Sequence, residues 1–279
     1  MIKKILIPID DRDTPKNNFL QYVTKAFPSA KFYIVSVVNI NQRGIHLTDL
    51  YYKEMTAGAE KLIKKIEKNL HDDGVKNVKC EALIGLPSKL IVKYAKSHDV
   101  DLIAIYVDSA KACARSYRIG STLRQVLRLY SMPVMVFTEK CDKIPIKKVL
   151  FPTDGKRKSR MAKNYALMFS SFYKTELEVF HVVKPNESEE RAKAILKDVE
   201  WKASFLNVKV KKTLEKGDAI TSIIDKILQR TEENDIIIMG IEKRFLFWHF
   251  LGKIINTIVT CPSIPVILVH DIKGDKEAV

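Results

Sequence analysis

The stretch that decides the fold is KILIPID at residues 4–10, which returns as KVLFPTD at residues 148–154. In each copy a lysine precedes a short apolar run, and the run ends in a proline, one further residue and an aspartate. Apolar runs without polar alternation are typical of strands that are covered on both faces, as in a parallel sheet. Both stretches therefore predict a buried strand that is followed at once by a carboxylate.

The rest of the chain repeats in the same order. SVV at 36–38 corresponds to HVV at 181–183, DLI at 101–103 to DII at 235–237, and MPVMV at 132–136 to IPVIL at 264–268. A preserved order of matches indicates two copies of one unit. We place a first domain at 1–140, a second at 146–272 and a flexible tail at 273–279, because residues 139–145 are polar and end in proline, as surface linkers do.

Each copy alternates apolar strands with amphipathic helices. In the first copy the strands are expected at 5–9, 32–38, 78–83, 102–105 and 134–137. Leu62, Ile63, Ile66 and Leu70 share one face of an expected helix that Gly74 ends. This alternation predicts two tandem α/β domains, each a doubly wound, five-stranded parallel sheet with right-handed, Rossmann-like crossovers.

Composition and charge narrow the class of protein. Of 279 residues, 46% are hydrophobic and 29% are charged, as in globular proteins, and the formal net charge is +15. That charge favours anionic partners, but the lysines are spread along the chain, so we expect a solvated surface rather than a nucleic-acid site. No run approaches about 20 apolar residues, so no transmembrane helix is expected. Four cysteines without a CxxC pair, and no apolar run typical of a secretory signal, predict free thiols and a cytoplasmic location.

The residues that follow the first strand of each copy are candidate ligand contacts, because open parallel sheets bind ligands at the carboxyl ends of their strands. They are Asp10 in the first copy and Asp154 with Gly155 in the second. A carboxylate there is able to accept a hydrogen bond from a ribose hydroxyl or from the adenine amino group. Such residues are also typical of turns and helix N-caps, and one residue can serve both purposes.

Glycines follow the third strand of each copy, at Gly85 and Gly217. Pro87 suits the first turn of the next helix, and Asp218 is a plausible N-cap. We interpret both glycines mainly as structural, although a glycine turn also lets a ligand approach the backbone.

The loop after the fourth strand carries the features of a phosphate site. In the first copy, Gly120, Ser121 and Thr122 enter the last helix, where free N–H groups and hydroxyls converge, and residues 111, 115 and 118 are basic. In the second copy the loop begins at Gly240 and enters its helix at Lys253.

These features, in this order and twice over, resemble the universal stress protein family. The resemblance implies a Rossmann-like fold of the adenine nucleotide alpha hydrolase-like type. In nucleotide-binding members the loop reads G-x2-G-x9-G-[S/T] and holds the phosphates of ATP, while the first-strand aspartate lies near adenine and ribose. It also implies that strands 134–137 and 266–269 pair about a pseudo-two-fold axis, so that the tandem chain mimics a dimer.

Both copies depart from that loop. Val107 and Ala110 stand where the first copy should have glycines, and Lys243 and Lys253 interrupt the pattern in the second. Glycine matters because it permits positive φ and close approach of the backbone to phosphate. We therefore expect degenerate sites that bind ATP or AMP weakly, with the helix-entry half kept in the first copy and the strand-exit half in the second.

The resemblance implies a non-catalytic protein of stress response or regulation. No nucleophile elbow, HExxH motif or complete P-loop is present, and the six histidines show no metal-ligand spacing; His181, at the end of the second copy's second strand, is expected to be packed. The alternative is an interaction scaffold without nucleotide binding, which acts through dimer-like assembly, homodimer formation and the aromatic loop FLFWHFL at 245–251.

Overall fold

A computed structural model describes residues 1–9, 18–39, 49–109, 119–156, 159–242 and 253–271. The chain splits into two compact units. One unit holds residues 2–106 and 120–132, and the other holds Met1, residues 107–119 and residues 133–279. Asp10, Ala110, Lys243, the aromatic loop 245–251 and the tail 273–279 lie outside the described residues.

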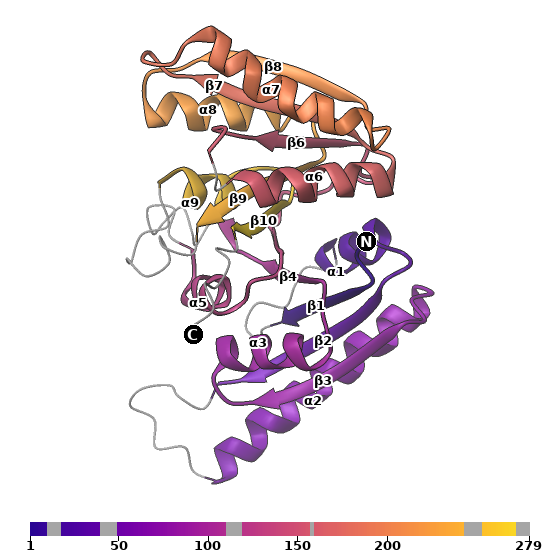
Figure 1. Cartoon of the computed structure of the whole chain (residues 1–279). Coiled ribbons are helices and arrows are strands. Elements are labelled where there is room, and N and C mark those ends of the chain that lie inside the picture. Colours follow the sequence, from indigo (N-terminus) through magenta and orange to yellow (C-terminus); the bar gives the residue numbers. More distant parts are fainter. Residues whose placement is uncertain (10–17, 40–48, 110–118, 157–158, 243–252, 272–279) are drawn as a thin grey trace, which may run out of the picture. The chain divides into compact units, whose positions relative to one another are not determined.

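The first unit is a parallel sheet with strand order β3-β2-β1-β4. The strands run over Lys4–Ile9 (β1), Lys31–Val38 (β2), Val78–Ile84 (β3) and Leu102–Tyr106 (β4), and the helices over Asn18–Ala26 (α1), Asp49–Asp72 (α2), Pro87–Ser97 (α3) and Ser121–Leu129 (α5). Figure 1 shows helix and strand alternating along the chain, as a doubly wound sheet requires.

The second unit has strand order β5-β10-β9-β6-β7-β8. Its strands are Val134–Phe137 (β5), Lys148–Pro152 (β6), Glu176–Val183 (β7), Val210–Lys216 (β8), Ile236–Glu242 (β9) and Val266–Asp271 (β10), and its helices are Arg160–Tyr173 (α6), Glu189–Ser204 (α7), Ile220–Arg230 (α8) and Lys253–Thr260 (α9). Strands β6 to β10 pair in parallel. The α/β class and the parallel, Rossmann-like sheets are confirmed.

Strand β5 pairs with β10 in the antiparallel sense, with Met135 opposite Ile267. The predicted pairing of strands 134–137 and 266–269 is therefore confirmed. By its contacts, β5 groups with the second unit. The domain bounds at 140 and 146 stay a prediction.

In both copies an aspartate side chain binds the backbone at the start of the first strand. In the first, Oδ2 of Asp101 accepts hydrogen bonds from the backbone N–H groups of Lys3 (2.8 Å) and Lys4 (2.9 Å). In the second, Oδ2 of Asp235 accepts them from residues 147 (2.7 Å) and 148 (2.8 Å). Each aspartate thus joins the start of its copy's first strand to the start of the fourth, and this explains why the aspartate recurs in the sequence.

Two of the helix ends predicted from the sequence are found in the structure, and one predicted N-cap is not. Helix α2 ends just before Gly74, whose φ is +83°, and Pro87 opens α3. Asp218 is not the N-cap of α8. That position is taken by Ala219, whose backbone is extended and which makes no side-chain cap, so the helix begins one residue later than the capping preference indicates. Among the described residues, no helix combines the length and the apolar character needed to cross a membrane.

Candidate functional site

A cavity of about 490 Å³ opens at the carboxyl ends of β6, β7 and β9 in the second unit. Pro152 ends β6, residues 180–182 lie near the end of β7, and Met239 and Gly240 belong to β9. Helices α8 and α9 supply further lining residues. Ligands bind at this edge of open parallel sheets because the connecting loops and helix N-termini converge there.

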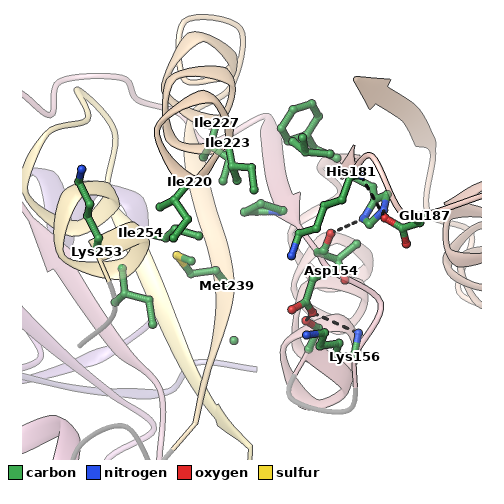
Figure 2. Close-up of a pocket in the computed structure, with 18 of the residues that line it drawn as sticks. Asp154, Lys156, His181, Glu187, Ile220, Ile223, Ile227, Met239, Lys253 and Ile254 are labelled. Atoms are coloured by element: carbon green, nitrogen blue, oxygen red, sulfur yellow. Dashed lines mark hydrogen bonds and ion pairs between the residues drawn. The ribbon is translucent and has the colours of Figure 1, made fainter. Parts of the chain in front are cut away.

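One wall of the cavity is apolar. Ile220, Ile223 and Ile227 recur at helical spacing along α8, and Ile254 on α9 and Met239 on β9 complete the wall. Figure 2 shows these side chains between the two polar ends of the cavity. A surface of this kind suits the flat, weakly polar face of a nucleobase.

Asp154 lines the opposite end and also shapes the turn after β6. Its Oδ1 accepts hydrogen bonds from the N–H of Lys156 (3.1 Å) and the hydroxyl of Ser159 (3.0 Å). Gly155 follows with a φ of +67°, and a Cβ there would collide with the side chain of Ile195. Asp154 is therefore both a turn residue and a residue of the cavity wall.

His181 lies beside this turn, with its side chain 3% exposed. Its Nδ1 is 2.7 Å from the carbonyl oxygen of Thr153, and its Nε2 is 2.9 Å from Oε2 of Glu187. The carbonyl oxygen only accepts, so Nδ1 carries a proton. Nε2 faces the carboxylate of Glu187. His181 is packed, as expected, but it also lines the cavity and joins β6 to the loop before α7.

Four basic residues line the cavity: Lys156, Lys184, Arg191 and Lys253. Figure 2 places Lys253, the first residue of α9, at the end of the cavity opposite Asp154 and Lys156. Only Lys253 was predicted from the sequence. Lys184 directly follows β7, and the general rule for carboxyl ends of strands applies to it as well as to Asp154.

The structure brings together Asp154, Gly240 and Lys253 of the predicted residues in the second copy. Gly155 and Gly217 are not among the lining residues. The N–H of Gly217 donates to the carbonyl oxygen of Val183 at 3.0 Å, and a Cβ at Gly217 would lie 2.6 Å from Cγ1 of Val182. Gly217 thus permits close packing behind the cavity.

In the first copy, the predicted residues Gly85, Gly120, Ser121 and Thr122 occupy a turn after β3 and the start of α5. Gly85 mirrors Gly217, since its N–H donates to the carbonyl oxygen of Val38 at 3.0 Å. Gly120 is the N-cap of α5, and Ser121 and Thr122 begin that helix. Their expected partner Asp10 lies outside the described residues, as do residues 110–118 of the loop.

Comparisons with known proteins agree with this architecture. Residues 1–138 match the model of the universal stress protein family. A universal stress protein of Methanocaldococcus jannaschii is 29% identical over 161 residues, which cover 50% of this chain and 97% of that protein.

Two solved structures superpose on nearly the whole chain. A universal stress protein from Archaeoglobus fulgidus superposes with a TM-score of 0.74 at 21% identity, covering 98% of this chain and 97% of that one. A putative universal stress protein from Pseudomonas aeruginosa gives 0.64 at 13% identity, covering 96% and 93%. At these identities the two structures support the fold alone. The first half of the chain, residues 1–138, thus resembles the universal stress protein family, and the whole chain shares the fold of these solved structures.

Proposed function

We propose that the second unit binds an adenine nucleotide, ATP or AMP, and that the protein acts as a non-catalytic regulator in stress response. The observation that carries this proposal is the cavity itself, with Asp154 at one end, Lys253 at the other and an apolar wall between them. The ribose hydroxyls are expected at Asp154 and the 5′ phosphates at the first turn of α9, where free N–H groups and Lys253 favour an anion.

The size and lining of the cavity support this assignment. A volume of about 490 Å³ falls within the range of small-molecule sites, which is about 300–1,000 Å³. Ile220, Ile223 and Met239 offer contact to a base. Because Lys253 is a single flexible charge rather than a glycine-lined cradle, we expect modest affinity.

The hydrogen bonds of the cavity support binding without turnover. Oδ1 of Asp154 is engaged by the turn that follows it, and His181 is held between Thr153 and Glu187. These groups therefore hold the turn and the loop in place rather than being directed at a reacting atom. Incubation with ATP is expected to leave the nucleotide intact over hours, and chromatography of the products measures this.

Calorimetric titration with ATP, ADP and AMP tests the proposal. Asp154→Asn keeps the Oδ1 acceptor for the turn but removes the charge, and we expect about tenfold weaker binding from the loss of a charge-assisted hydrogen bond. Lys253→Ala should weaken ATP more than AMP. Lys197→Ala, at an exposed α7 residue outside the cavity lining, is the control and should bind as the wild type does. Absence of heat at millimolar nucleotide, or an unaffected Asp154→Asn, overturns the proposal.

A second candidate is an interaction scaffold that assembles as a homodimer. It is supported by exposed aromatic side chains on α6, on α7 and directly after α7, where Phe172, Trp201 and Phe205 are 59%, 62% and 68% exposed. We expect a dimer by light scattering that Trp201→Lys disrupts; a monomer at all concentrations would speak against it. A cytoplasmic location is proposed as well, in line with the free thiols of Cys80, Cys141 and Cys261.

A further inference from the structure

We propose that the cavity of the second unit contains a second anion subsite, formed by Lys156, Lys184 and Arg191 beside Asp154. Its ligand class is an adenosine nucleotide that carries a phosphate on the ribose, at the 2′ or 3′ oxygen, as well as one at the 5′ oxygen. This inference rests on the proposed nucleotide binding and specifies which nucleotide the site prefers.

Each of the three basic residues contacts Asp154 or Glu187, the lysines through their backbone N–H groups and the arginine through its side chain. The N–H of Lys156 donates to Oδ1 of Asp154 at 3.1 Å. The N–H of Lys184 lies 3.5 Å from Oε2 of Glu187, and Nε of Arg191 lies 3.8 Å from Oε1 of the same carboxylate. Because Glu187 reaches the residue before Asp154 through the ring of His181, all three cations belong to the ribose end of the cavity.

The charges at this end do not balance. The carboxylate of Glu187 lies 3.8 Å from Nε of Arg191, so it counts against that cation. Asp154 is the second carboxylate among the lining residues named for this end, which also include three cations. The excess of one positive charge attracts an anion to a place where an unmodified ribose would offer only hydroxyls.

The side-chain ammonium groups of Lys156 and Lys184 have no carboxylate within 4.0 Å in the described part of the chain. On the same unit, by contrast, other lysines are paired at short range: Lys211 with Glu233 (2.8 Å), Lys212 with Glu200 (2.6 Å) and Lys226 with Glu215 (2.8 Å). The chain thus neutralises lysines on β8 and α8 and leaves those at the cavity available for a ligand.

The opposite end of the cavity carries its own positive charge. Figure 2 shows Lys253 on α9 across the apolar wall from Asp154, Lys156, His181 and Glu187. A ligand that satisfies both ends has negative charge at both ends and an apolar centre. An adenosine bisphosphate with separated phosphates meets this description, whereas ATP places all of its charge at one end.

Calorimetric titration with adenosine 3′,5′-bisphosphate, adenosine 2′,5′-bisphosphate, AMP and ATP tests the inference. We expect at least one bisphosphate to bind about tenfold more tightly than ATP, since charge-assisted hydrogen bonds to phosphate are the strong ones. ATP is the charge control, because nonspecific attraction to a basic protein follows total charge.

Variants assign the preference to these side chains. Lys184→Ala and Arg191→Ala should remove most of the preference for the bisphosphate while changing AMP affinity less than about twofold. Lys197→Ala should leave both affinities unchanged. Binding of AMP and ATP without any preference for a bisphosphate, or a preference that survives both variants, overturns the subsite and leaves the proposed function standing. Absence of binding by every nucleotide overturns the proposed function itself.

Discussion

Nε2 of His181 lies 2.9 Å from Oε2 of Glu187, while the other ring nitrogen lies 2.7 Å from the carbonyl oxygen of Thr153. One buried imidazole therefore links the strand β7, the turn that carries Asp154 and the loop that leads into α7. The carbonyl oxygen of Thr153 only accepts, so Nδ1 carries the proton of that hydrogen bond. The position of Asp154 in the cavity depends on this link.

Substitution of His181 by Phe is expected to destabilise the protein by about 2–3 kcal/mol, because the carbonyl of Thr153 and the carboxylate of Glu187 lose buried partners. Urea denaturation measures the change. Glu187→Gln is the milder control, since an amide NH₂ can donate to Nε2 while Nδ1 still donates to Thr153. A His181→Phe variant that is as stable as the wild type would contradict the role of this link.

Gly155→Ala is expected to cost about 1–3 kcal/mol. A φ of +67° is unfavourable for a residue with a Cβ, and the added carbon meets the side chain of Ile195. Gly58→Ala is the matched comparison: Gly58 lies inside α2 with nothing within 4 Å of the added carbon, so we expect a neutral or stabilising effect of up to about 1 kcal/mol. Equal effects of the two substitutions in urea denaturation would refute this reading of the turn.

Asp101→Ala and Asp235→Ala are expected to weaken their own units by similar amounts, about 2–3 kcal/mol each, because each leaves two backbone N–H groups without their acceptor. Hydrogen exchange resolved along the chain measures how large the loss of stability is and in which strands it occurs. The loss of protection should be centred on β1 for the first variant and on β6 for the second. A large effect of only one variant would show that the repeated aspartates are not equivalent.

We expect the ion pairs of Glu215 to make a pH-dependent contribution to the free energy of unfolding. The hydrogen bond from Lys226, together with those from Arg230, holds the pKa of Glu215 below its ordinary value of 4.5, against the opposing effect of burial. A lowered pKa in the folded state stabilises the protein above the unfolded-state pKa, and this stabilisation is lost as pH falls through the folded-state value.

Glu215→Gln should therefore lower the urea midpoint at pH 7, and the difference from the wild type should shrink as the pH falls below about 4.5. Glu232→Gln, at a nearby exposed position, is the control and should show no such trend. A deficit for Glu215→Gln that does not vary with pH would exclude the ion pairs as its cause.

Much of the architecture was predictable because it depends on local patterns that occur twice. The buried runs at 5–9 and 149–152, the end of α2 before Gly74 and the start of α3 at Pro87 each reflect the preferences of a few neighbouring residues. The N-cap at Asp218 was wrong, since capping preference is weak and the backbone of Ala219 is already extended where α8 begins.

The cavity was predictable only in part. Asp154, Gly240 and Lys253 follow from the rule that ligands bind at carboxyl ends of strands, and they line one cavity. Lys156 and Arg191 carried no distinguishing signal, because the chain has 48 lysines and arginines in all. Lys184 was missed, although it directly follows β7 and the same rule applies to it. Their significance comes from where their charges lie and from which of them lack a carboxylate partner.

By itself, the sequence determined the duplicated α/β unit, its strands and the edge of the sheet where the cavity lies, because short apolar runs and turn residues act over a few positions. Only the tertiary structure decided which charges meet. His181 finds one acceptor 6 residues away and another 28 residues away, and Lys253 lies across the apolar wall of the cavity from Asp154. Electrostatic balance depends on distances in space, which are set once the sheet and its covering helices have packed.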